Sequence, residues 1–262
     1  MTSLALRFAV LLALPLVAAT SATAKEKPYR RLPAEIGAGG PPPAEVLERA
    51  KALAVAAEAG SADEVFAFMA DRPTIISSGI TLGVARRIEK TGPFTDGSAA
   101  LAEIGGNYME GDMVGPGGTP VDQTKMRVDQ AMRTIGEVLA SAKWGRDPLV
   151  PRAWCTSRGA RWDAEAAKKA GLDGERGVFV TAKVAARAAA DGAAKVVATV
   201  TPGVLYRSFQ VDEENGFSGI VLPDGAIGWV AADKVGDPMP WGLCFEKRPA
   251  GWILTTFVSA LN

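Results

Sequence analysis

Histidine is absent from this chain of 262 residues, and its absence removes several chemistries at once. Ser-His-Asp and Cys-His catalysis both need an imidazole base, and the commonest zinc sites need imidazole ligands. Carboxylates are then the first candidates for acid–base work. Glu103, Glu110 and Asp112 lie close together in the sequence, and two carboxylates at a suitable distance can hydrolyse a glycan. A solvated helix face explains the same three residues without any chemistry.

Two other motifs carry less chemical content. The glycine-rich segment Gly111–Gly118 (GDMVGPGG) lacks the lysine and the strand–loop–helix order of a phosphate-binding loop. Arg158–Trp162 (RGARW) combines cations with an aromatic ring, and we expect it to pack one segment on another. We find no metal-binding or cofactor-binding motif, so the sequence predicts no metal and no cofactor.

Cys155 and Cys244 are the two cysteines of the chain. In an oxidising compartment, two cysteines usually form one disulfide bond. Without histidine, neither thiol has the neighbouring base that a cysteine nucleophile most often uses. We expect a Cys155–Cys244 disulfide, and a pair of buried thiols is the alternative.

Residues 1–24 have the order of features of a signal peptide. Arg7 precedes a short apolar run at 8–19, and Ala22-Thr23-Ala24 offers small residues for cleavage after Ala24. No later segment is long and apolar enough to span a membrane. The 29 basic residues equal the 29 acidic ones, so nucleic acid is not an expected partner. The sequence predicts a periplasmic or secreted protein with no transmembrane segment after signal cleavage.

The rest of the chain divides into segments by composition and periodicity. Residues 25–43 are rich in glycine and proline and predict a flexible linker. Residues 44–145 predict a helical domain, because apolar residues recur at three- and four-residue spacing. Residues 146–176 form a connector. From residue 177 the period changes to two, and short strands separated by Asp-Gly, Pro-Gly and Asn-Gly turns predict a small barrel with a C-terminal hairpin at 177–262.

The barrel segment contains Asp224-Gly225-Ala226-Ile227-Gly228-Trp229-Val230, a D-G-x-x-G-W-V hairpin, and an earlier strand that ends in Arg187 before a loop of small residues. In these features residues 177–235 resemble a bacterial SH3 (SH3b) domain. The terminal hairpin resembles the tail of exported bacterial SH3-domain proteins. The resemblance implies an α+β protein, a mostly helical N-terminal domain followed by a small antiparallel SH3-like β-barrel.

Arg187, Tyr206, Phe217 and Trp229 are the candidate ligand-binding residues of this barrel, and no catalytic residue is assigned. We expect Trp229 to fill the barrel interior, and an exposed Trp229 would instead be the best ligand contact. The first functional hypothesis is an exported, non-catalytic cell-envelope binding or adaptor protein whose partner is peptidoglycan or an envelope protein. The alternative is a carboxylate-dependent cell-wall hydrolase that the barrel targets to its substrate.

Overall fold

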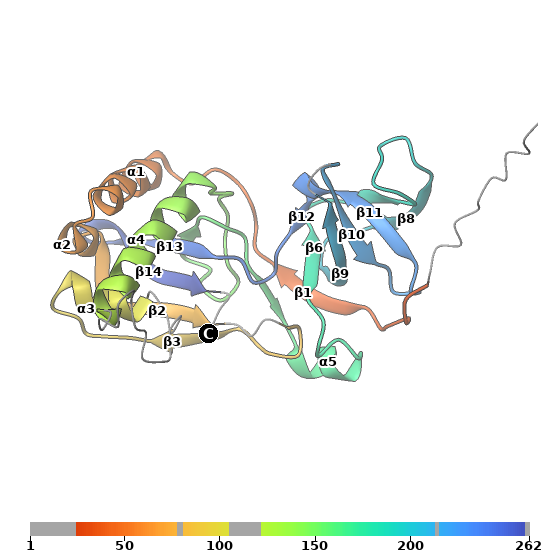
Figure 1. The fold of residues 1–262 in the computed structure, drawn as a ribbon, viewed down its shortest axis with the longest axis horizontal. Coiled ribbons are helices and arrows are strands. Elements are labelled where there is room, and N and C mark those ends of the chain that lie inside the picture. Colours follow the sequence, from red (N-terminus) through yellow and green to blue (C-terminus); the bar gives the residue numbers. More distant parts are fainter. Residues whose placement is uncertain (1–24, 78–80, 105–121, 213–214, 260–262) are drawn as a thin grey trace, which may run out of the picture.

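The computed structural model describes residues 25–77, 81–104, 122–212 and 215–259. Two lobes lie side by side, and each is built on one β-sheet (Figure 1). The chain passes from one lobe to the other after β1, again after β4 and again after β12. Strands hold 34% of the structure and helices 26%.

The first lobe is a five-stranded sheet whose helices pack on one face (Figure 1). Apolar side chains of α1 and α4 meet those of the sheet in one core, which includes Leu53, Ile135 and Phe245. The elements are α1 (Ala44–Glu58), α2 (Ala62–Phe66), α3 (Gly97–Ile104) and α4 (Gln123–Ala140), with strands in the order β3 (Arg87–Lys90), β2 (Met69–Ser77), β14 (Gly251–Ser259), β13 (Gly242–Arg248) and β4 (Trp154–Cys155).

The prediction of a mostly helical N-terminal domain followed by a small SH3-like barrel is therefore wrong. The helices do form at the expected places, but they cover a sheet that the N-terminal half only begins. β14 pairs in parallel with β2, so the terminal hairpin completes this sheet and is not part of the barrel segment. Local periodicity cannot show a pairing between strands so far apart in the sequence.

The second lobe is a nine-stranded, curled antiparallel sheet. It is larger than the expected barrel because β1 and β5 join it from outside residues 177–262. Its main path runs β12 (Val235–Gly236), β6 (Gly177–Val180), β9 (Val204–Asp212), β10 (Phe217–Val221), β11 (Ile227–Ala231), β7 (Val184–Arg187) and β8 (Val196–Val200); β1 (Leu32–Ile36) pairs with β9 and with β5 (Ala160–Trp162), and α5 (Ala164–Lys169) and the 3₁₀ turn Ala232–Lys234 complete it.

Residues 25–43 are not the flexible linker that their composition predicts. Leu32 is buried and begins β1, and the Tyr29 hydroxyl donates a 2.7 Å hydrogen bond to the Val221 carbonyl. Two large apolar side chains thus fix a segment whose glycines and prolines, taken alone, indicate flexibility.

Cys155 and Cys244 form a disulfide, which confirms the predicted pairing. The two residues face each other on β4 and β13, and their Cα atoms are 4.0 Å apart. The bond is compatible with an oxidising compartment outside the cytoplasm. Among the described residues, no helix combines the length and the hydropathy that crossing a membrane requires.

Candidate functional site

Trp229 lies on the outer face of the curled sheet, not in its interior. Its neighbour Val230 is fully buried, and so are Ala186 and Ile220, which face the same core from β7 and β10. Because side chains alternate along a strand, Trp229 and its register partner Arg187 both point outward. The expectation that Trp229 fills the interior is therefore wrong, and its half-buried ring is available for contact.

Phe209 completes this surface. Its side chain is 44% exposed, and its ring meets that of Trp229 edge to face with the centroids 6.5 Å apart. Gly219 pairs with Trp229 from β10, and a bulge in the β9–β10 pairing at this point places Phe209 across from it. A glycine leaves no side chain between the two rings.

A row of side chains thus crosses the outer face of five neighbouring strands, of which β10 contributes only Gly219. Val196 on β8 is opposite Arg187 and is 48% exposed. The Arg187 guanidinium donates a 2.8 Å hydrogen bond to the Ala194 carbonyl in the loop between β7 and β8, and a guanidinium has further N–H donors beyond this one. We call this row, made of Arg187, Val196, Phe209 and Trp229, the outer strip.

The other two candidate ligand-binding residues, Tyr206 and Phe217, lie on opposite faces of the curled sheet. Tyr206 is buried, and its hydroxyl accepts a hydrogen bond from the Thr201 amide and donates one to the Thr201 carbonyl, so it belongs to the core. Phe217 is half-buried, lies two residues before Gly219 on β10 and shares the outer face with the strip.

The described structure contains one of the three carboxylates proposed for hydrolysis. Glu103 lies on α3, whereas Glu110, Asp112 and the segment Gly111–Gly118 lie outside the described residues. Within the described ranges, no cluster of three or more acidic or cysteine side chains could hold a metal ion.

The Arg158–Trp162 cluster ties segments together. The Arg158 Nε group donates a 2.8 Å hydrogen bond to the Gly37 carbonyl, and burial lowers the pKa of this arginine. The Trp162 indole N–H donates to the Leu82 carbonyl at 2.8 Å, and Arg161 pairs with Glu35. These contacts fit the expected packing role.

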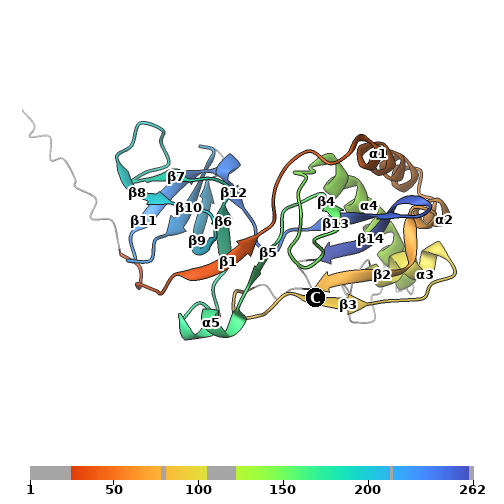
Figure 2. The ribbon, with the colours of Figure 1, turned by 180° about the vertical axis from the view of Figure 1, so that it is seen from behind.

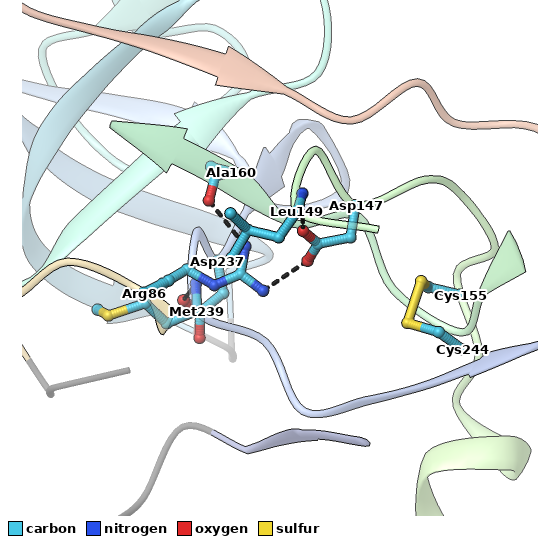
Figure 3. Close-up of polar contacts among 8 residues, drawn as sticks. All are labelled: Arg86, Asp147, Leu149, Cys155, Ala160, Asp237, Met239 and Cys244. Atoms are coloured by element: carbon cyan, nitrogen blue, oxygen red, sulfur yellow. Dashed lines mark hydrogen bonds and ion pairs between the residues drawn. A yellow bond between two sulfur atoms is a disulfide. The ribbon is translucent and has the colours of Figure 1, made fainter. Parts of the chain in front are cut away.

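A buried ion pair between the lobes was not foreseen from the sequence. Arg86 and Asp147 are almost fully buried, and their side chains are 2.5 Å apart (Figure 3). Arg86 also donates to the Ala160 carbonyl at 2.7 Å, and Asp147 accepts from the Leu149 amide at 2.9 Å. Each partner thus also bonds to the main chain, although the buried Arg86 Nε has no hydrogen-bond partner among the described residues, and the pair acts as a brace between the lobes.

Asp237 lies beside this brace (Figure 3). Its carboxylate accepts a 2.8 Å hydrogen bond from the Met239 amide. Desolvation raises the pKa of Asp237, and the positive charges of Arg86 and Arg176 partly oppose that effect. Since Arg86 and Asp147 lie 61 residues apart in sequence, no local motif could have revealed the brace.

A groove of about 830 Å³ runs between α1 and α4 on the helical side of the first lobe. Alanines and Gly136 leave it wide, and Trp144 is its aromatic lining residue. Charged side chains join the apolar ones; the lining consists of Leu47, Ala50, Lys51, Ala54, Ala57, Glu58, Asp129, Met132, Arg133, Gly136, Leu139, Ala140 and Trp144. Such a surface can bury an apolar ligand.

Comparison with known proteins adds no relative, because no family model, curated protein or solved structure matches this chain.

Proposed function

We propose that the protein is a non-catalytic binding protein of the cell envelope, located in the periplasm or outside the cell. The single observation that carries this proposal is the outer strip, in which Trp229, Phe209 and Arg187 are held side by side on a rigid sheet. Tryptophan and arginine dominate the binding energy of many protein interfaces. A sheet that already orders them lowers the entropic cost of binding.

The chemistry of the strip fits an envelope component with both apolar and acidic groups. The Trp229–Phe209 pair offers aromatic edges and faces to apolar surface, and the other N–H groups of Arg187 offer donors to a carboxylate. Peptidoglycan carries sugars and acidic peptides together, and it is our first candidate partner. An envelope protein with an acidic, apolar surface patch is the second.

Location outside the cytoplasm is supported by two independent features. The disulfide between Cys155 and Cys244 is of the kind that persists in oxidising compartments. The order of charged, apolar and small residues in 1–24 is that of a signal peptide. The hydrolase alternative has no comparable support in the described residues, because of its three carboxylates only Glu103 lies among them.

Sedimentation with purified peptidoglycan tests the proposal. The full mature chain, Trp229→Ala, Arg187→Gln and the control Val55→Ala are each mixed with peptidoglycan and with a membrane-protein fraction of the envelope. Val55 is 61% exposed on α1, away from the strip, so its variant controls for loss of surface apolar area.

We expect the wild type and the control to bind one of the two fractions, and each strip variant to bind at least about tenfold more weakly. Circular dichroism must show that the variants remain folded. Equal binding by all four proteins, or no binding to either fraction, would contradict the proposal.

A further inference from the structure

The described residues cover only part of the second face of the five-stranded sheet. Helices occupy the first face (Figure 2). Because side chains alternate along a strand, Ile76, Cys244 and Val258, which pack together away from the helical core, belong to the second face. These three pack with Ala153 and Val150 of the preceding loop and close one half of this face. Over the other half the described residues leave a cavity, and most of the side chains that line it are polar.

The volume of this cavity is about 310 Å³. Three arginines from separate parts of the chain reach it: Arg72 from β2, Arg152 from the loop before β4, and Arg248 from the end of β13. The remaining lining is made of Ala70, Thr74, Ile88, Val150, Pro151, Ala153, Glu246, Thr255 and Thr256.

The charges around this cavity do not balance. Glu246 is the one acidic residue of its described lining and pairs with Arg248 at 2.5 Å. Arg72 and Arg152 form no ion pair with any described residue. Two guanidinium groups therefore face one small cavity with no counter-charge from the described chain.

Hydroxyl groups occupy the floor between the arginines. The Thr74 and Thr256 hydroxyls are 2.8 Å apart and share a hydrogen bond, and Thr256 is only 2% exposed. Their β2 and β14 positions are register partners, and Lys90 of β3 is the partner of Thr74 on its other side. The same row thus adds a further cation at the margin of the cavity.

The wall that carries Arg152 is held in place. The Arg146 guanidinium donates to the carbonyls of Arg152 and Ala153 and stacks 3.8 Å from the Trp154 ring centroid. One residue further on, Cys155 is bonded to β13. The backbone at Arg152 is therefore fixed before any ligand arrives, while its exposed side chain stays free to reach a ligand.

We infer that this cavity is a binding site for a small anion, a molecule with a carboxylate or phosphate group and a short apolar part. Guanidinium groups recognise both oxyanions through paired N–H donors. Ile88, Val150 and Pro151 supply the apolar side. A volume of 310 Å³ is at the lower end for ligand pockets and fits a molecule of about amino-acid size. This site is on the other lobe from the outer strip and is independent of the envelope-binding proposal.

Titration of the full mature chain by two-dimensional NMR tests the inference. The probes are sodium phosphate and sodium succinate, each compared with sodium chloride at the same ionic strength. The variants are Arg72→Gln and Arg152→Gln, and Arg133→Gln is the matched control because it removes an arginine from α4 on the opposite face.

We expect saturable shifts at Thr74 and Thr256 with at least one probe, and the better probe shows whether phosphate or carboxylate is preferred. Each cavity variant should weaken binding about tenfold, as for the loss of one charge-assisted hydrogen-bond partner, and the control should not. Shifts that grow linearly and equally with chloride would overturn the inference. So would saturable binding that neither cavity variant changes.

Discussion

At the scale of single residues, one step along a strand separates core from surface. Val230 is fully buried whereas Trp229 beside it is half-buried on the outer face. The sequence correctly predicted that side chains alternate between two faces of this strand. It did not predict which of the two faces lies in the core. Residue size favours tryptophan for the interior, yet the sheet closes around smaller side chains, Ala186, Ile220 and Val230.

Two alanine variants distinguish these positions by stability. Val230→Ala should lower the free energy of unfolding by roughly 2 kcal/mol, since two buried methyl groups and some cavity are involved. Trp229→Ala should lower it by about 1 kcal/mol or less, because its ring is half in solvent already. Urea unfolding measures both. A larger loss of unfolding free energy for Trp229→Ala than for Val230→Ala would contradict the placement of Trp229 on the outer face.

Tyr29 gives the molecule a pH dependence in the alkaline range. Burial raises its pKa to about 12, against an ordinary 10.0. Below pH 10 the phenol is neutral in both states, and its stabilising effect is complete. As the pH rises from 10 to 12, the unfolded chain loses the proton first, so stability falls by up to roughly 2–3 kcal/mol.

Unfolding at pH 9 and at pH 11.5 measures this loss, with Tyr29→Phe as the control that has no phenol to ionise. We expect the variant to be less stable than the wild type at pH 9, because it lacks the hydrogen bond to Val221. Its further loss at pH 11.5 should be smaller. Identical losses in both proteins would show that Tyr29 titrates normally.

At the scale of elements, local sequence predicted positions well and partners poorly. The helix expected to begin at Ala44 does so, and Ser61 and Asp163 accept hydrogen bonds from the first turns of α2 and α5. These features depend on neighbours within four residues. The parallel pairing of β14 with β2 and the docking of β1 on β9 depend on contacts far apart in the chain. No periodicity carries that information.

Gly136 is an element-scale anomaly in α4. A Cβ added there would meet no atom within 4 Å, so packing does not require glycine. Glycine costs a helix interior about 1 kcal/mol relative to alanine. Gly136→Ala should therefore raise the free energy of unfolding by about 0.5–1 kcal/mol, measured by urea unfolding.

A second glycine-to-alanine substitution, at Gly97, where a Cβ has no room, serves as the control. Gly97→Ala would push a Cβ against the backbone of Ala62 and should destabilise the protein. A destabilising Gly136→Ala would mean that the groove between α1 and α4 is narrower than described.

At the scale of the whole molecule, the candidate site was half predictable. Arg187 and Trp229 could be selected because a turn-containing motif and a strand end marked them. The arginines of the anion cavity could not, because Arg72, Arg152 and Arg248 belong to three distant segments. Arg187 and Trp229 each lie in a segment with a recognisable local pattern, whereas the cavity residues lie in segments that have no such pattern.

The disulfide closes a loop that contains most of the second lobe. Reduction should lower the free energy of unfolding by about 2–5 kcal/mol, the usual range for a native disulfide. The test is urea unfolding with and without dithiothreitol, for the wild type and for Cys155→Ala/Cys244→Ala. The wild type should shift with reductant and the double variant should not. An unchanged wild-type midpoint would exclude a stabilising role for the bond.

The position of β14 determines when the sheet of the first lobe can be completed during synthesis. This strand lies between β2 and β13, at the centre of the first lobe's sheet, although it is formed by residues 251–259. Residues 44–140 leave the ribosome long before it, and until then their helices lack the sheet that buries their apolar faces. The sheet of the first lobe is therefore completed only when the last strand of the chain is available. For the exported protein that we propose, this late completion leaves time for a translocation channel to thread the chain before the lobe folds.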